Sequence, residues 1–195
     1  MNIFALDLDP QKAAIDHVDS HVVKMRVESC QLLVSTIHAC NNVKEITKEY
    51  TERFFHDFPR LNSSGDVFPY GIGYVHHPCR VWVGKSRSNW DWLCELCLQL
   101  CREHSFRFGL TLNKQISFKV LQWRKSNRPN IPDIGTTPFA LAVDKSLKVD
   151  DYDLEDAVRI YRQFYAKFKS HLHSWTKRST PSYCVKDALL VALIS

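Results

Sequence analysis

The sequence contains little glycine, only 6 residues among 195, and it lacks a long apolar run. The shortage of glycine argues against glycine-rich loops that cradle phosphate groups and against many tight hairpins. No run approaches the roughly 18 apolar residues that suggest a transmembrane helix. The opening stretch MNIFALDLDP has two acidic residues and no basic one, so it does not resemble a secretory signal.

Established catalytic and nucleotide-binding motifs are also missing. The chain has no P-loop, no GxGxxG, no HExxH, no GxSxG and no CxxC pair at zinc-finger spacing. A zinc deaminase needs a Pro-Cys-x-x-Cys block, but Trp82 stands where the second cysteine would follow His77-Pro78-Cys79. We therefore expect neither a metal ion nor a cofactor.

The seven cysteines are an odd number and favour reduced thiols. Cys94, Cys97 and Cys101 lie in the apolar helical stretch WLCELCLQLCREH. Their spacing resembles a metal motif only superficially, and small buried apolar side chains explain them better. We therefore expect an intracellular protein, in the cytoplasm or, in a eukaryotic host, in the nucleus, with no membrane partner.

Periodic apolar positions predict a mainly α-helical fold of five or six helices, in a single domain over residues 1–195. Asp9-Pro10 predicts the start of a short helix, Pro78 starts a long helix that Gly109 ends, and Asp153 caps another. Two stretches rich in proline and polar residues predict long loops. The predicted helices cover residues 10–17, 16–38, 78–108, 114–125 and 154–175, and the predicted loops cover residues 56–77 and 127–148.

The remaining segments are predicted more coarsely. Residues 1–8 are short and apolar, and they form either an extended edge segment or a buried N-terminal arm. Residues 43–50 add another helical turn or two, and a kink is expected near Asp19-Ser20. Residues 182–195 carry one apolar run and are treated as a C-terminal extension.

The stretch from Asp16 to His38 is the one around which the rest of the chain is organised. Apolar residues recur there at helical spacing, and a polar stripe occupies the opposite face. The stripe consists of His21, Lys24, Glu28, Gln31, Ser35 and His38. The stripe offers, in one row, a base, a cation, a carboxylate, an amide and a hydroxyl. Such a set suits proton transfer or anion binding. A solvated helix face explains the same pattern, although such faces more often repeat Glu and Lys pairs.

Two further polar clusters lie on other predicted helices. One comprises His76, His77, Trp82, Ser86 and Asn89, near a helix start whose free N–H donors suit a phosphate or a carboxylate. The other comprises Tyr161, Arg162, Tyr165, Lys169, Trp175 and Arg178. Each has a structural alternative, because histidines cap helices, tryptophans fill cores and basic residues occupy solvated faces.

The charge distribution favours an anionic partner. Residues 81–130 carry nine basic and three acidic residues, a net charge of +6, and residues 156–186 carry seven and one, again +6. The first eighty residues carry eight basic and ten acidic residues, a net charge of −2. Two basic segments on either side of a loop indicate a nucleic acid or nucleotide partner. A modest charge that only serves solubility is the alternative.

Four blocks of the sequence occur in a recognisable order: MNIF…DPQKAA, DSHVVKMRVESCQLL, HHPCRVWVGKSRSNWDWL and YRQFYAKFK…W…R…P. Over residues 1 to 181 the chain thereby resembles a family of small helical proteins from bacteriophage and other viral genomes. The resemblance brings no established activity. It implies viral or virus-like ancestry, and such genes often act on nucleic acids, nucleotides or host defence, which is an association and not a mechanism.

These observations together predict an enzyme that acts on a nucleic-acid base or a nucleotide by glycosidic-bond or group-transfer chemistry. Glu28, or a nearby acid such as Asp19, would be the general acid/base, and Lys24 would stabilise charge or act as an amine nucleophile. His21 and His77 would shuttle protons or bind phosphate. The predicted substrate-binding residues are Gln31, Trp82, Ser86, Asn89, Tyr161, Arg162 and Lys169.

Two other classes of function stay open. A non-catalytic binder of nucleic acid, a nucleotide signal or a host defence protein would use the same basic and aromatic groups without acid/base chemistry. A metal-dependent hydrolase would use His17, His21 and His76 or His77, but their spacing matches no known ligand motif.

Overall fold

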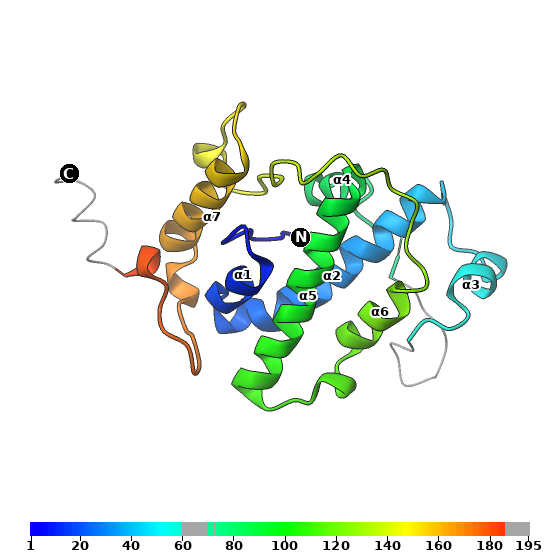
Figure 1. The fold of residues 1–195 in the computed structure, drawn as a ribbon, viewed down its shortest axis with the longest axis horizontal. Coiled ribbons are helices and arrows are strands. Elements are labelled where there is room, and N and C mark those ends of the chain that lie inside the picture. The colour runs from blue at the N-terminus through cyan, green and yellow to red at the C-terminus, as the bar shows by residue number, and fades with distance from the viewer. Residues whose placement is uncertain (60–69, 72, 186–195) are drawn as a thin grey trace.

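The computed structural model describes residues 1–59, 70–71 and 73–185 (Figure 1). Over these residues the chain forms seven α-helices and no β-strand, which confirms the mainly helical prediction. The helices are α1 (Pro10–Asp16), α2 (Asp19–Cys40), α3 (Lys48–Phe55), α4 (Pro78–Lys85), α5 (Arg87–Phe108), α6 (Ile116–Arg124) and α7 (Leu154–Phe168). The short 3₁₀ helices are η1 (Leu112–Lys114), η2 (Lys145–Leu147), η3 (Ser170–Leu172) and η4 (Ser182–Cys184).

The predicted number of five or six helices is too low, because the helix expected over residues 78–108 is divided. Ser86 alone separates α4 from α5, and its backbone is extended, with φ −146° and ψ 148°. The Ser86 hydroxyl donates to Asp133 Oδ1 at 3.3 Å and accepts the Ile134 N–H at 3.3 Å. The break therefore depends on contacts with a loop that is distant in the sequence. The local spacing of apolar residues does not reveal these contacts.

The helix caps expected from the sequence are present. The Asp9 carboxylate accepts the Gln11 N–H at 2.8 Å at the start of α1. The Asp153 carboxylate accepts the Asp156 N–H at 2.8 Å at the start of α7. Gly109 ends α5 with a left-handed φ of 80°, the conformation that favours glycine after a helix.

Several helix boundaries differ from their predicted positions, and α2 covers Asp19–Cys40 instead of residues 16–38. The helix of residues 154–175 ends at Phe168, because the chain tightens into η3 and then turns back. The helix of residues 114–125 begins at Ile116, after η1. The turn expected at residues 43–50 is the later helix α3, whose N-cap Thr47 accepts the Tyr50 N–H at 3.1 Å.

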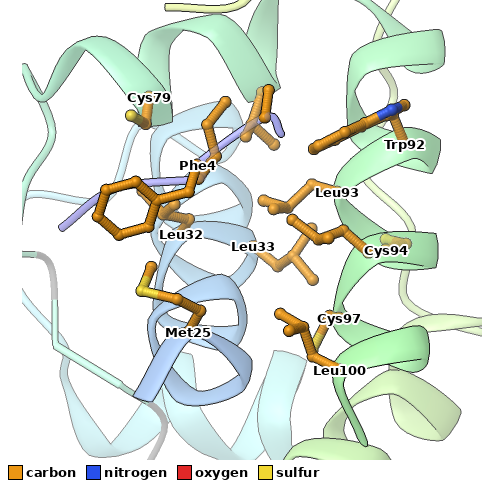
Figure 2. Packing of buried hydrophobic residues seen from close by; sticks show 14 of the residues in the cluster. Phe4, Met25, Leu32, Leu33, Cys79, Trp92, Leu93, Cys94, Cys97 and Leu100 are labelled. Atoms are coloured by element: carbon orange, nitrogen blue, oxygen red, sulfur yellow. The ribbon is translucent and has the colours of Figure 1, made fainter. Parts of the chain in front are cut away.

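Helices α2 and α5 form the centre of the fold and pack against each other where they cross (Figure 1). Figure 2 shows Leu33 of α2 pointing toward Leu93 and Leu100 of α5. The three cysteines of α5 are buried as expected, and Cys97 Sγ lies 3.8 Å from Cys30 Sγ of α2. The core is also rich in aromatic residues, and its largest fully buried side chains include Trp90, Tyr161, Tyr165, Phe55 and Phe139.

The N-terminal segment is a buried arm. Asn2 to Leu6 are all buried, and the arm lies between α7 and α2 (Figure 1). The Tyr161 hydroxyl of α7 lies 2.9 Å from Asn2 Oδ1. Phe4 has a left-handed φ of 37°, and its ring stacks on the His21 ring of α2 with centroids 4.6 Å apart. The arm therefore brings backbone groups against the polar stripe of α2.

A buried ion network fixes the C-terminal segment against α5 and the start of α2. The Arg107 side chain is completely buried and donates to Asp19 Oδ1 and Glu103 Oε2, each at 3.0 Å. Arg107 also donates to two backbone carbonyls at the α1–α2 junction, and Arg178 binds the same Glu103. This network holds the segment that follows α7 against α5 and the start of α2.

None of the helices within the described ranges has both the length and the apolar composition that crossing a bilayer requires. The predicted loop over residues 127–148 contains no α-helix and only the short η2. Residues 60–69 and 72 of the other predicted loop lie outside the described residues, as do residues 186–195 of the predicted extension.

Candidate functional site

The polar stripe of α2 faces the protein over much of its length. His21, Ser35 and His38 are buried. The His21 Nδ1 lies 2.5 Å from the Tyr165 hydroxyl of α7, and the Ser35 hydroxyl donates to the Gly73 carbonyl at 2.8 Å. His38 is hydrogen-bonded through both ring nitrogens. A solvated helix face therefore does not describe these three residues.

The accessible part of the stripe is centred on Glu28. The Glu28 side chain is 12% exposed, and its carboxylate lies 3.3 Å from Nζ of Lys24, whose side chain is 67% exposed. The other carboxylate oxygen accepts the Asn2 N–H at 3.0 Å. Gln31 is half-buried about one turn further along the same face. The Asn2 N–H of the arm thus holds one oxygen of the carboxylate, and the flexible side chain of Lys24 lies next to the other oxygen.

His77 brings the start of α4 into the electrostatic range of Glu28. Burial and the Met1 amino group lower the pKa of the His77 imidazole, while the Glu28 carboxylate opposes this shift. The His77 Nδ1 accepts the Cys79 N–H at 3.2 Å as the N-cap of α4. In the neutral ring the proton must then sit on Nε2, and a hydrogen bond with the Met1 backbone, which also opposes the lowering of the His77 pKa, engages the ring on the other side.

His21 is a neutral group at physiological pH. Burial lowers its pKa to about 3, and the neighbouring His17 and the positive charges of Lys169 and Lys24 contribute to this shift. A neutral imidazole can donate or accept a hydrogen bond, but it brings no positive charge to a phosphate. Its hydrogen bond to Tyr165 instead joins α2 to α7.

The basic residues near His21 come from separate elements. Lys169 caps the C-terminal end of α7 and His171 lies in η3, and both are close enough to His21 to affect its pKa. We use the name α2 site for Lys24, Glu28, His21, His77 and Lys169. This set combines one carboxylate, two flexible cations and two neutral imidazoles, and such a set can exchange a proton and hold an anion.

Asp19, the alternative acid, is occupied by structural contacts. Burial alone would raise the pKa of Asp19, but hydrogen bonds from Ser174, Thr176 and Arg107 lower it overall. The carboxylate accepts the Ser174 hydroxyl at 2.8 Å and the Thr176 N–H at 3.0 Å. Asp19 is therefore better suited to anchor the C-terminal segment than to transfer a proton.

Three predicted substrate-binding residues hold a loop instead of joining the α2 site. Asn89 is buried, and its side chain donates to the Trp82 carbonyl and to Thr137 Oγ1, each at 2.8 Å. Asn89 also accepts the Thr137 N–H at 2.9 Å, and Trp82 Nε1 donates to the Thr137 carbonyl at 3.0 Å. Ser86 holds Asp133 of the same loop, so none of these partners belongs to the α2 site.

Tyr161 and Arg162 fasten the N-terminal arm to α7. The buried Tyr161 hydroxyl lies 2.6 Å from the Ala140 carbonyl, in addition to its contact with the arm. Arg162 Nε donates to the Leu6 carbonyl at 2.8 Å, and its Nη2 pairs with the Asp7 carboxylate at 2.8 Å. Among the predicted residues of this cluster, Lys169 and Tyr165 adjoin His21 of the α2 site, and the Tyr165 hydroxyl lies 2.5 Å from His21 Nδ1.

A groove of about 860 Å³ lies along the outer face of α7, separate from the α2 site. The residues of α7 that line it are charged, polar and apolar: Glu155, Val158, Arg159, Arg162, Gln163, Ala166 and Lys167. The remaining walls come from the end of the arm, from η2 and from Tyr183 of η4. It does not include Glu28.

The histidines that a metal-dependent hydrolase would use have other partners. The His17 Nδ1 donates to the Ala13 carbonyl at 2.6 Å, and the His17 and His21 ring centroids are 6.4 Å apart. In the part of the chain that the structure describes, no group of three or more His, Cys, Asp or Glu side chains is arranged to hold a metal ion. The metal-dependent alternative therefore gains no support from geometry.

The sequence did not single out two contributors to this region, Asn2 and His171. Asn2 acts through its backbone N–H, which carries no residue-specific signal. His171 was expected inside a helix, whereas it lies in η3 after the chain leaves the helical path. The apolar opening residues predicted a buried arm as one of two options, but its partners on α2 and α7 could not be read from spacing.

Comparison with known proteins identifies no relative, because no protein-family model, no curated protein and no solved structure matches the chain. The resemblance to viral proteins stays a prediction, and the function must be inferred from the site itself.

Proposed function

We propose that the protein is an enzyme that acts on a nucleic-acid base or a nucleotide, by glycosidic-bond or group-transfer chemistry. The placement of Glu28 supports this proposal most directly. Its carboxylate lies at the boundary between interior and solvent, fixed by the Asn2 N–H at 3.0 Å and by Lys24 at 3.3 Å. A positioned carboxylate that a ligand can reach is suited to general acid or base catalysis.

The neighbouring cations suit an anionic substrate. Lys24 and Lys169 carry flexible ammonium groups that can bind phosphate oxygens as point charges. Lys24 would stabilise the charge that develops in the reaction, or it would attack as an amine after proton loss. Both lysines lie close enough to His21 to affect its pKa, which is more specific than the basic composition of either segment.

His77 would orient the substrate through its Nε2–H in exchange for its hydrogen bond with the Met1 backbone, because its Nδ1 is engaged with the Cys79 N–H. His21 would act indirectly, by holding Tyr165 and hence the end of α7 in place. Gln31 offers an amide next to Glu28 that can recognise a base edge. In this proposal Trp82, Ser86, Asn89, Tyr161 and Arg162 support the fold, so their predicted contacts with substrate are not part of it.

The second candidate is a non-catalytic binder of a nucleic acid, a nucleotide signal or a host defence protein. The groove on α7 favours it, because three basic residues (Arg159, Arg162 and Lys167) outnumber two acids (Asp7 and Glu155) in its lining, and Glu28 is absent from it. For both candidates we propose a viral origin, which the four sequence blocks support, and an intracellular location, which the free cysteines support.

Turnover by the wild-type protein separates the two candidates. The protein should be incubated with DNA and RNA oligonucleotides of all bases, single-stranded and duplex, and with nucleotides, and released bases or altered products should be measured by mass spectrometry. Product that disappears in Glu28→Gln but persists in Glu52→Gln supports the enzyme. Glu52 is the matched control, because it forms an exposed i, i+4 pair with Lys48 at 3.7 Å. Saturable binding without any product would support the binder.

A further inference from the structure

The groove along α7 leaves apolar side chains partly exposed. Val158, Arg162 and Ala166 line it and recur every four residues, so they form one row on α7. Leu8 of the arm and Leu147 of η2 belong to the same lining, and Leu8 is 40% exposed. A groove of about 860 Å³ with apolar side chains in its walls is typical of a place where another group binds.

A second row of α7 forms the solvent-exposed rim of the groove. It consists of Glu155, Arg159, Gln163 and Lys167. Arg162 pairs with Asp7 at 2.8 Å and Arg159 pairs with Asp156 at 2.7 Å. In the part of the chain that the structure describes, these pairs leave one lining cation and one lining acid without a salt bridge. Long polar side chains can also lay their methylene groups against apolar neighbours, so the groove suits an apolar occupant with little net charge.

The chain reaches this groove just before its last ten residues. Tyr183 of η4 is part of the lining, and η4 packs against α7. The Arg162 guanidinium carbon lies 5.2 Å from the centroid of the Tyr183 ring, so the chain meets α7 near the middle of the helix. Two residues later, Val185 is 42% exposed. The residues that follow therefore start beside the groove.

We use the name tail for residues 186–195, which lie outside the described residues. The tail reads KDALLVALIS, and its positions 188–194 are seven consecutive apolar residues. Its two charged residues, Lys186 and Asp187, have opposite signs and come first. Apolar side chains are stabilised when they leave water, so this run and the apolar walls of the groove are complementary.

The tail is also long enough. Ten residues span at most about 33–36 Å when extended and about 15 Å as an α-helix. Helix α7 has 15 residues and is therefore about 22 Å long. Because the chain meets α7 near its middle, either form of the tail can reach one end of the groove.

We propose that the tail binds in the groove along α7 and covers the row of Val158, Arg162 and Ala166. The occupant of the groove is thus a segment of the same chain. This inference does not rest on Glu28 or on the α2 site. A ligand of the second candidate function would have to displace the tail from the groove.

Photo-crosslinking of the full chain tests this inference. A diazirine amino acid takes the place of Leu190, and mass spectrometry locates the residues that it reaches after irradiation. The expected products join position 190 to α7, to Leu8 or to Leu147 within one chain. Mixing unlabelled and ¹⁵N-labelled protein before irradiation distinguishes links within one chain from links between two. Links to the groove only between chains, or no link to its lining, would overturn the proposal.

Two substitutions give a matched comparison. Ala166→Glu places a carboxylate on the row and should reduce the yield of these links severalfold, because an apolar segment cannot compensate the lost hydration of the charge. Gln122→Glu adds the same charge at an exposed position of α6 outside the lining and should leave the yield unchanged. Equal yields in the wild type and a folded Ala166→Glu would overturn the proposal.

Methyl NMR of the full chain gives a second readout that does not depend on Ala166→Glu. The double substitution Leu189→Asp and Leu193→Asp should shift the methyl signals of Leu8 and Leu147, because it removes apolar groups that cover them. The methyl signals of Leu100, which is buried in α5, should stay in place. Unchanged signals of the groove residues would show that the tail does not bind there.

Discussion

Acid should destabilise the protein through His17 before its carboxylates are protonated. His17 is fully buried, and burial lowers its pKa from 6.5 to about 4. The folded state therefore keeps this ring neutral while the unfolded chain takes up a proton below pH 6.5. The unfolded state binds more protons in this window, so the unfolding free energy falls as the pH falls.

The size of the effect follows from the two pKa values. The difference between 6.5 and about 4 corresponds to roughly 3 kcal/mol, at about 1.4 kcal/mol per pH unit. This stabilisation is complete above pH 6.5, declines between pH 6.5 and about 4, and changes no further below that. His21 adds a loss of the same sign that extends to about pH 3.

Urea unfolding followed by circular dichroism at several pH values measures this dependence. His17→Gln should flatten the decline by roughly 3 kcal/mol between pH 6.5 and 4, whatever its stability at neutral pH. His56→Gln, at an exposed position after α3, should leave the decline unchanged. If the slope of the His17 variant equals that of the wild type, the buried neutral histidine is the wrong explanation.

Three other predictions follow from particular contacts. Arg107→Ala should lower the unfolding free energy by about 3–5 kcal/mol, because it removes a partner from the buried Glu103 and the half-buried Asp19 carboxylates. Exposed Arg159→Ala should change it by less than about 1 kcal/mol; urea unfolding measures both, and equal losses would contradict the reasoning. Asn89→Ala should speed hydrogen exchange at Thr137, whose N–H it leaves unpaired, and unchanged exchange would argue against the anchor. Lys169→Ala should weaken nucleic-acid or nucleotide binding and reduce its salt dependence by one phosphate contact.

The sequence predicted the features that depend on neighbouring residues. The caps at Asp9 and Asp153 and the left-handed Gly109 are local signals, and all three appear in the structure. The break at Ser86 was not predictable, because its hydrogen bonds reach Asp133, 47 residues further along the chain. Local periodicity in fact continues across that break, so the pattern favoured a single helix.

In the candidate site, too, the sequence predicted local contacts but not long-range ones. The i, i+4 spacing of Lys24 and Glu28 predicted their contact, and the two side chains lie 3.3 Å apart. The arm and α7 determine which part of the stripe is accessible, and both are long-range partners. Asn89 was expected near the substrate, but its hydrogen bonds to the loop became apparent only when the loop was placed.

The most direct test of the proposed function compares affinity with turnover in Glu28→Gln. Glutamine keeps the shape of the side chain and an oxygen for the Asn2 N–H, while it removes the group that transfers the proton. The proposal predicts that Kd for the substrate stays within several-fold and that kcat falls about a hundredfold or more. If a folded Glu28→Gln keeps both its affinity and its kcat, then Glu28 is not the general acid/base and the α2 site is not the active site.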